Sequence, residues 1–144
     1  MTMFRLTTAL VALALTASTL AAQTLRPNAL LAGTDTPAQR KIALAQAAIA
    51  RNPKHAQALA DLALALTQRA RETADPVYYQ QAEAAVQAAL AITPDHFEAR
   101  KVSAWALLGQ HRFAEALALA TALNRQVPDD LMVYGILTDA HIEL

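Results

Sequence analysis

Histidines and adjacent carboxylates are the residues of this chain whose types could support acid–base or metal chemistry. Two of the histidines, His55 and His96, each fall two residues after a proline, so we expect equivalent positions one repeat apart and no shared ion. Asp129 and Asp130 precede an apolar segment, where a carboxylate caps a helix and meets its positive end. Helix-end roles therefore explain these side chains better than catalysis does. The remaining histidines are His111 and His141.

The motifs that would turn such residues into a site do not occur in the sequence. There is no H-E-x-x-H zinc motif, no G-x-S-x-G nucleophile turn and no glycine-rich phosphate loop. The chain has no cysteine, which excludes disulfides and thiolate zinc sites. We predict a protein that is not an enzyme and has no cofactor and no bound metal.

Composition points to an all-α fold. Alanine occupies 36 of the 144 positions, and it is the strongest helix former because it loses no side-chain entropy on folding. Glycine occurs only three times, and clusters of β-branched residues are few. Lys plus Arg and Asp plus Glu both number 12, and no basic patch stands out, so nucleic acid is not an expected partner.

Residues 1–22 have the order of a secretory signal peptide. Arg5 precedes an uncharged stretch, residues 6–22, whose centre is continuously apolar and whose end is Ala21-Ala22. We expect cleavage there and a secreted or periplasmic protein. The alternative is a membrane anchor through residues 6–22, which would be short for a spanning helix. Residues 23–35, with a proline and a glycine, are expected to form a linker.

Proline marks the joints between successive helices. Pro53, Pro94 and Pro128 each follow one apolar helical run and precede another, with separations of 41 and 34 residues. We place the seven additional residues in a lengthened turn, 71–76, that leads from a helix over about 56–69 into one over about 77–92. Asp75 is expected to cap this second helix and Pro76 to be its first residue, and Thr36-Pro37 has the same order at the start of the half-unit 36–53. Around the turn, Tyr78-Tyr79 with Arg69 and Arg71 could form a small recognition patch, but packing of one tyrosine against the turn explains them better.

The spacing within each unit follows a known repeat. The first complete unit has Leu59, Leu62-Ala63 and Leu66 on one helical face, followed by Ala82, Val86 and Pro94. The second has Arg100, Ser103-Ala104 and Leu107, followed by Ala116, Ala120 and Pro128. Lys41, Ala45, Ala48 and Pro53 fit a lone second helix, and Tyr134, Leu137-Thr138 and His141 fit a lone first helix. This pattern resembles the tetratricopeptide-repeat family over residues 36–144.

The resemblance implies a right-handed superhelix of antiparallel helical hairpins, an α-solenoid. Its units would be a half-unit at 36–53, repeats at 54–94 and 95–128, and an incomplete repeat at 129–144. An up-and-down bundle is the alternative, which the proline joints disfavour. Because the last unit is incomplete and apolar, we also expect either a fragment of a longer array or a covered end.

The resemblance also implies a concave groove lined by the first helix of each hairpin, and hence a protein or peptide ligand. Trp105, the single tryptophan, could dominate binding or simply pack on the neighbouring helix. One alternative is a structural role, in which the chain self-associates through residues 131–144. Another is that the chain is the N-terminal part of a longer repeat protein with a functional domain downstream. The groove-facing candidates are Gln57, Ala60, Leu64, Thr67, Gln68, Glu98, Lys101, Trp105, Leu108, Met132, Gly135, Asp139 and Ile142.

Overall fold

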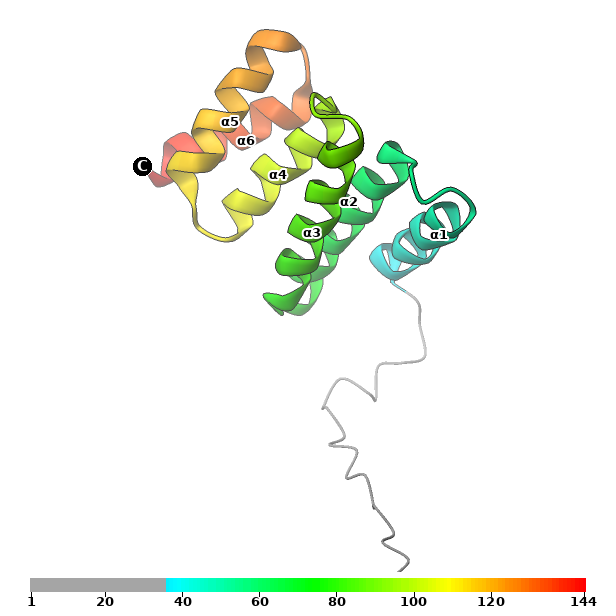
Figure 1. Ribbon diagram of the computed structural model, residues 1–144. Coiled ribbons are helices and arrows are strands. Elements are labelled where there is room, and N and C mark those ends of the chain that lie inside the picture. Colours follow the sequence, from blue (N-terminus) through cyan, green and yellow to red (C-terminus); the bar gives the residue numbers. More distant parts are fainter. Residues whose placement is uncertain (1–35) are drawn as a thin grey trace, which may run out of the picture. The chain divides into compact units, whose positions relative to one another are not determined.

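The computed structural model describes residues 36–144. The predicted leader, residues 1–22, and the predicted linker, residues 23–35, lie outside the described residues. Six helices and no strand occur between residues 36 and 144 (Figure 1). They are α1 (Pro37–Arg51), α2 (Ala56–Thr73), α3 (Val77–Ile92), α4 (Phe97–Gly109), α5 (Phe113–Gln126) and α6 (Leu131–Glu143).

Four of the helices begin at a side-chain cap that the sequence specifies locally. Thr36 forms a capping box with Gln39 at the start of α1, and Asp130 Oδ1 accepts a hydrogen bond from the Val133 N–H (2.9 Å) at the start of α6. At α2 and α4 the cap is a histidine. His55 Nδ1 accepts from Ala58 N–H at 3.0 Å and His96 Nδ1 from Ala99 N–H at 3.2 Å, which confirms their equivalent positions at helix ends.

The seven additional residues of the first repeat lie in its helices, so the expected lengthened turn was wrong. Helix α2 has 18 residues against 13 in α4, and α3 has 16 against 14 in α5. Both hairpin turns have the same length, 74–76 and 110–112. The reason is that residues 70–73 continue the good helix-forming run of α2, and Ala70 is buried by packing.

Both hairpin turns reverse the chain with one left-handed residue that is not glycine. Ala74 has φ of 53° and His111 has φ of 59°. After Ala74, Asp75 Oδ1 accepts a hydrogen bond from the Val77 N–H (3.0 Å). The N-cap of α3 is Pro76, one residue after the expected Asp75, because α3 begins at Val77 and not at the proline. Each turn therefore carries a backbone strain of about 1 kcal/mol that packing of the hairpin must outweigh.

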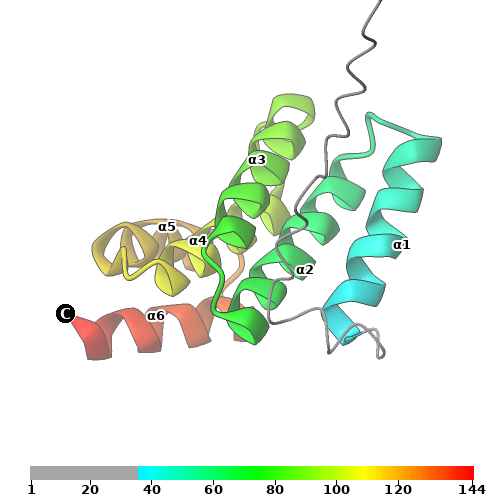
Figure 2. The ribbon, with the colours of Figure 1, turned by 90° about the horizontal axis from the view of Figure 1, so that it is seen from below.

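The helices pack in a repeating pattern that defines an inner and an outer row. Consecutive helices contact each other, and α2 also contacts α4, as α4 contacts α6. Helices α1, α3 and α5 make no contact with one another. Because α2, α4 and α6 contact one another in order while α1, α3 and α5 lie apart, the array bends with α2, α4 and α6 on the inner side (Figures 1 and 2). We call these the inner helices and α1, α3 and α5 the outer helices.

Small residues allow the close approach of helices within each hairpin, as the sequence predicted. Ala63 and Ala82 in the first hairpin, and Ala104 and Ala116 in the second, are fully buried. Arg100 takes a position where the family pattern has a large apolar residue, and its Nη1 instead donates a hydrogen bond to Gln126 Oε1 at the far end of α5 (3.2 Å). None of the six described helices is long and apolar enough to cross a membrane.

Candidate binding groove

The inner helices enclose a groove of about 340 Å³ on the inner side of the array. Leu64 and Gln68 come from α2, Trp105 comes from α4, and four further residues come from about two turns of α6. These four are Met132, Gly135, Ile136 and Asp139. Six of the seven residues that line the groove are among those that the sequence indicated; Ile136 was not, because its position in the repeat is a core position and its side chain is 2% exposed.

Other predicted ligand residues do not present their side chains to this groove. Thr67 is fully buried, and its hydroxyl donates to the Ala63 carbonyl oxygen at 2.9 Å. Ala60 is buried between the helices, and Leu108 packs into the core beneath the inner surface. Gln57 is exposed and donates from Nε2 to Asp61 Oδ1 (2.8 Å) on its own helix. Helical phase alone does not separate these positions from the groove, because the neighbouring inner helix decides which face stays open.

Lys101 was also expected in the groove, and the structure places it inside the α4–α6 junction. Its side chain is 10% exposed, and Nζ lies 2.7 Å from Asp130 Oδ2 and 2.9 Å from Glu98 Oε1. The ammonium also lies 5.2 Å from the centre of the Phe97 ring. Glu98, which was also predicted to face a ligand, is therefore engaged in an ion pair with Lys101. Lys101 therefore holds the start of α6 against α4 and positions one wall of the groove.

Burial and hydrogen bonding shift the pKa of Lys101 in opposite directions, and they do the same for Asp130. Burial alone would lower the pKa of Lys101, but hydrogen bonds to Asp130 and Glu98 outweigh it and leave the pKa raised. Burial likewise would raise the pKa of Asp130, and the hydrogen bonds from Lys101 and from the Val133 backbone N–H leave it lowered. Both groups are therefore held in their charged forms.

Trp105, which lines the groove, is in contact with a residue from another helix. The guanidinium carbon of Arg71, near the end of α2, lies 5.4 Å from the centre of the indole ring. Trp105 also packs against the core cluster around Ala104 and Val133, which confirms the packing role expected for it, and its role in binding stays a prediction. The sequence placed Arg71 in a separate patch at the turn, because nothing in the order of residues shows that α2 ends over α4.

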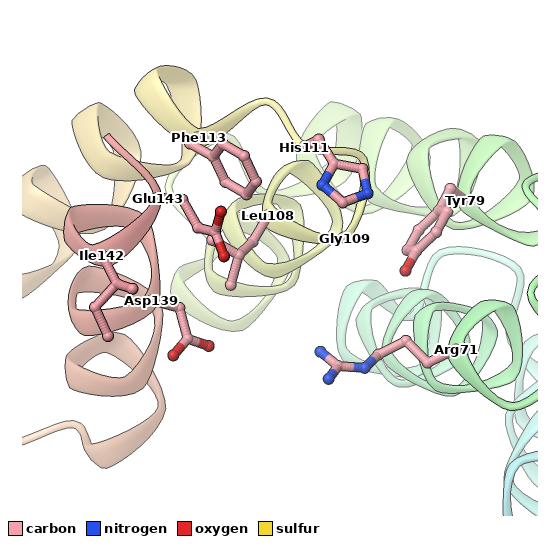
Figure 3. A pocket seen from close by; sticks show the side chains of 9 residues that line it. All are labelled: Arg71, Tyr79, Leu108, Gly109, His111, Phe113, Asp139, Ile142 and Glu143. Carbon is pink, nitrogen blue, oxygen red and sulfur yellow. The ribbon is translucent and has the colours of Figure 1, made fainter.

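A second hollow, of about 330 Å³, lies at the same end of the array as the two hairpin turns (Figure 3). Arg71 and Tyr79 flank it on one side, and Asp139 and Glu143 of α6 flank it on the other, with Phe113 between (Figure 3). The rest of its lining is Leu108, Gly109, His111 and Ile142, of which Leu108 and Ile142 were predicted to face a ligand. Asp139 lines both this hollow and the groove, so the two are neighbours.

A third hollow, of about 340 Å³, continues the inner surface toward α1. It is lined by Leu44, Ala45 and Ala48 of α1 with Asp61 and Leu64 of α2, and Lys41 lies at its edge. Leu64 belongs to this hollow and to the groove. Lys41 Nζ donates a hydrogen bond to Gln68 Oε1 (3.1 Å), which connects α1 to the wall of the groove. Between residues 36 and 144 no three His, Asp or Glu side chains are grouped so that they could hold a metal ion.

The arrangement of helical hairpins around a continuous inner surface defines a helical-repeat solenoid. Residues 79–140, from α3 to the end of α6, match a family model described as tetratricopeptide repeat. This match and the six-helix architecture support a tetratricopeptide-repeat protein. Comparison with curated proteins and comparison with solved structures each gave no match. Repeats of this family are protein–protein interaction modules and are typically not catalytic.

Proposed function

We propose that this protein is an exported, non-catalytic scaffold that binds a peptide or a protein segment along the groove of its inner helices. The observation that carries the proposal is that Leu64, Trp105 and Met132, from three different inner helices, line one hollow. An apolar hollow with a few polar groups at its rim is the usual form of a peptide-binding site. Trp105 is held against its neighbours, so little side-chain freedom would be lost on binding.

A displayed library of random peptides of about 12 residues tests this proposal, with the purified full chain as bait. Enriched peptides would then be labelled with fluorescein and their binding measured by fluorescence polarisation, because Trp105 is the only tryptophan and a signal from it would be lost in a Trp105 variant. We expect Trp105→Phe or Leu64→Ser to weaken binding about tenfold or more. Tyr134→Ser is the matched control, because Tyr134 is 46% exposed and lies outside the groove.

Failure to enrich any peptide that distinguishes the groove variants from the control would overturn the proposal. Export is tested separately, by fractionating a bacterial host that expresses the full chain and determining the mass of the product. The expected result is release from the cytoplasm and a mass that lacks about the first 22 residues. A full-length, membrane-bound product would instead favour an uncleaved anchor.

A second candidate function is self-association through α6, and one observation favours it. Leu131 is 85% exposed, and Tyr134 is 46% exposed on the same helix. Large apolar side chains at such exposure are candidates for an interface. Sedimentation of the full chain and of Leu131→Ser/Tyr134→Ser decides between the roles. Oligomers that the double substitution dissociates, while peptide binding is retained, would assign assembly to α6.

A further inference from the structure

The groove and the second hollow meet at a pair of carboxylates on α6. Asp139 lines both hollows, and Glu143, four residues later, lines the second. Residues four apart share a helix face, and Figure 3 shows both carboxylates on the side of the cavity opposite Arg71. Neither carboxylate has a hydrogen-bond or ion-pair partner among residues 36–144. Like charges at this spacing repel one another unless a cation lies between them.

The other charged group of this region is already engaged. Arg71 lies over the Trp105 ring on the wall opposite α6, and it also lines the second hollow. Two carboxylates against one guanidinium leave the second hollow with a formal charge of −1 when His111 is neutral. A ligand group with one positive charge would therefore neutralise it. An acidic ligand would meet the two unpaired carboxylates at the place where the hollows join.

The surroundings of the carboxylates also fit a long basic side chain. The rings of Tyr79 and Phe113 line the second hollow, and aromatic faces attract a desolvated guanidinium or ammonium group. The adjoining groove is mainly apolar, with Leu64, Trp105 and Met132 in its wall. An extended peptide that filled both hollows would thus place an apolar side chain in one and a basic side chain in the other.

We propose that the ligand is a peptide segment in which an apolar residue stands close to a lysine or arginine. The apolar side chain occupies the groove over Trp105, and the basic side chain lies between Asp139 and Glu143. This assignment rests on the proposed peptide-binding function and specifies the chemistry of its ligand. It follows from the charge balance of the hollow and from the continuity of the two hollows at Asp139.

The test uses fluorescein-labelled glycine–serine peptides with one fixed leucine and with arginine, glutamine or glutamate at successive positions after it. Binding to the full chain is measured by fluorescence polarisation at low and at physiological salt. We expect arginine peptides to bind about tenfold or more tightly than the glutamine peptides of the same spacing, and glutamate peptides to bind most weakly. Asp139→Asn/Glu143→Gln should abolish this preference, while helicity and Tm are retained because neither carboxylate has a partner in the part of the chain that the structure describes.

The matched control is Glu83→Gln/Asp95→Asn, which removes the same charge from exposed positions outside both hollows. It should leave the arginine preference unchanged. If arginine and glutamate peptides bind equally, and Trp105→Phe weakens both, the peptide-binding function stands and the basic-ligand assignment falls. If the preference survives Asp139→Asn/Glu143→Gln, the assignment also falls. If no peptide binds the wild-type chain, and the displayed library enriches none, both proposals fall.

Discussion

Asp130 has two roles, the ion pair with Lys101 and the cap of α6, and substitutions at this position separate them. One oxygen, Oδ2, lies 2.7 Å from Lys101 Nζ, and the other, Oδ1, accepts the Val133 N–H at the start of α6 (2.9 Å). Asp130→Asn keeps an oxygen for the cap and removes the charge. Asp130→Ala removes both. The difference in unfolding free energy between the two variants therefore measures the contribution of the cap. The loss of stability in Asp130→Asn measures the contribution of the charge.

The expected magnitudes follow from burial, since the side chains of Lys101 and Asp130 are only 10% and 16% exposed. A hydrogen bond to a charged, largely buried group contributes about 1.5–3 kcal/mol, so Asp130→Asn should lower the free energy of unfolding by about 2 kcal/mol. Loss of the cap adds about 1 kcal/mol in Asp130→Ala. Asp129→Asn, one residue earlier and exposed, is the control and should change stability by less than about 0.5 kcal/mol.

Urea unfolding followed by far-ultraviolet circular dichroism measures all three variants. A double-mutant cycle with Lys101→Met, which keeps an apolar stem beside Phe97, should give a coupling energy between residues 101 and 130 of about 1–3 kcal/mol. If Asp130→Asn proved as neutral as Asp129→Asn, or if the coupling were zero within error, the ion pair would not hold α6 in place. The account of how the groove wall is positioned would then be refuted.

The same pair predicts a pH dependence with a defined sign. The pKa of Asp130 is lower in the folded chain than in the unfolded one, so its contribution is present above the unfolded pKa of about 4 and is lost as the pH falls through the folded pKa. The pKa of Lys101 is raised, so its contribution is present below about 10.4 and is lost as the pH rises through the folded value. The stability gap between wild type and Asp130→Asn should therefore be largest near neutral pH and shrink in acid and in strong base. A gap that is constant with pH would contradict the assignment of charge.

Three further substitutions test the helix ends and the close contacts by thermal unfolding. Ala74→Gly should raise the free energy of unfolding by about 1 kcal/mol because the residue has positive φ, whereas Ala88→Gly, exposed within α3, should lower it by a similar amount; equal signs would contradict this. Gly109→Ala should lower the free energy of unfolding by about 1–2 kcal/mol, because an added Cβ would lie 2.6 Å from the ring of Tyr79 in α3. Gly135→Ala should raise it, because that position has open space and alanine is the better helix former. A Gly109→Ala variant as stable as the wild type would refute the close contact. His96→Asp should stabilise by about 0.5–1 kcal/mol, because a carboxylate caps a helix and opposes its dipole better than an imidazole does; an unchanged Tm would count against the capping role.

Much of the local structure was determined by short stretches of the sequence. Prolines after the apolar runs and the caps Thr36 and Asp130 fix where helices stop and start, because caps and proline act over a few residues. The alanines at matched spacing predicted the hairpin contacts, which Ala63 and Ala82 confirm by complete burial. The length of α2 was less accessible, because residues 70–73 suit either a helix or a polar turn until packing selects one.

The binding surface depended on contacts that the order of residues does not contain. Helical phase placed Thr67, Lys101 and Trp105 on similar faces, yet Thr67 is buried, Lys101 is enclosed by Asp130, and Trp105 alone remains at the groove. The spacing of 34 residues between Arg71 and Trp105 gave no sign that they stack. Local rules act through neighbouring backbone groups and are written in the sequence. Exposure and charge pairing are set by which helix lies opposite, and only the tertiary structure decides that.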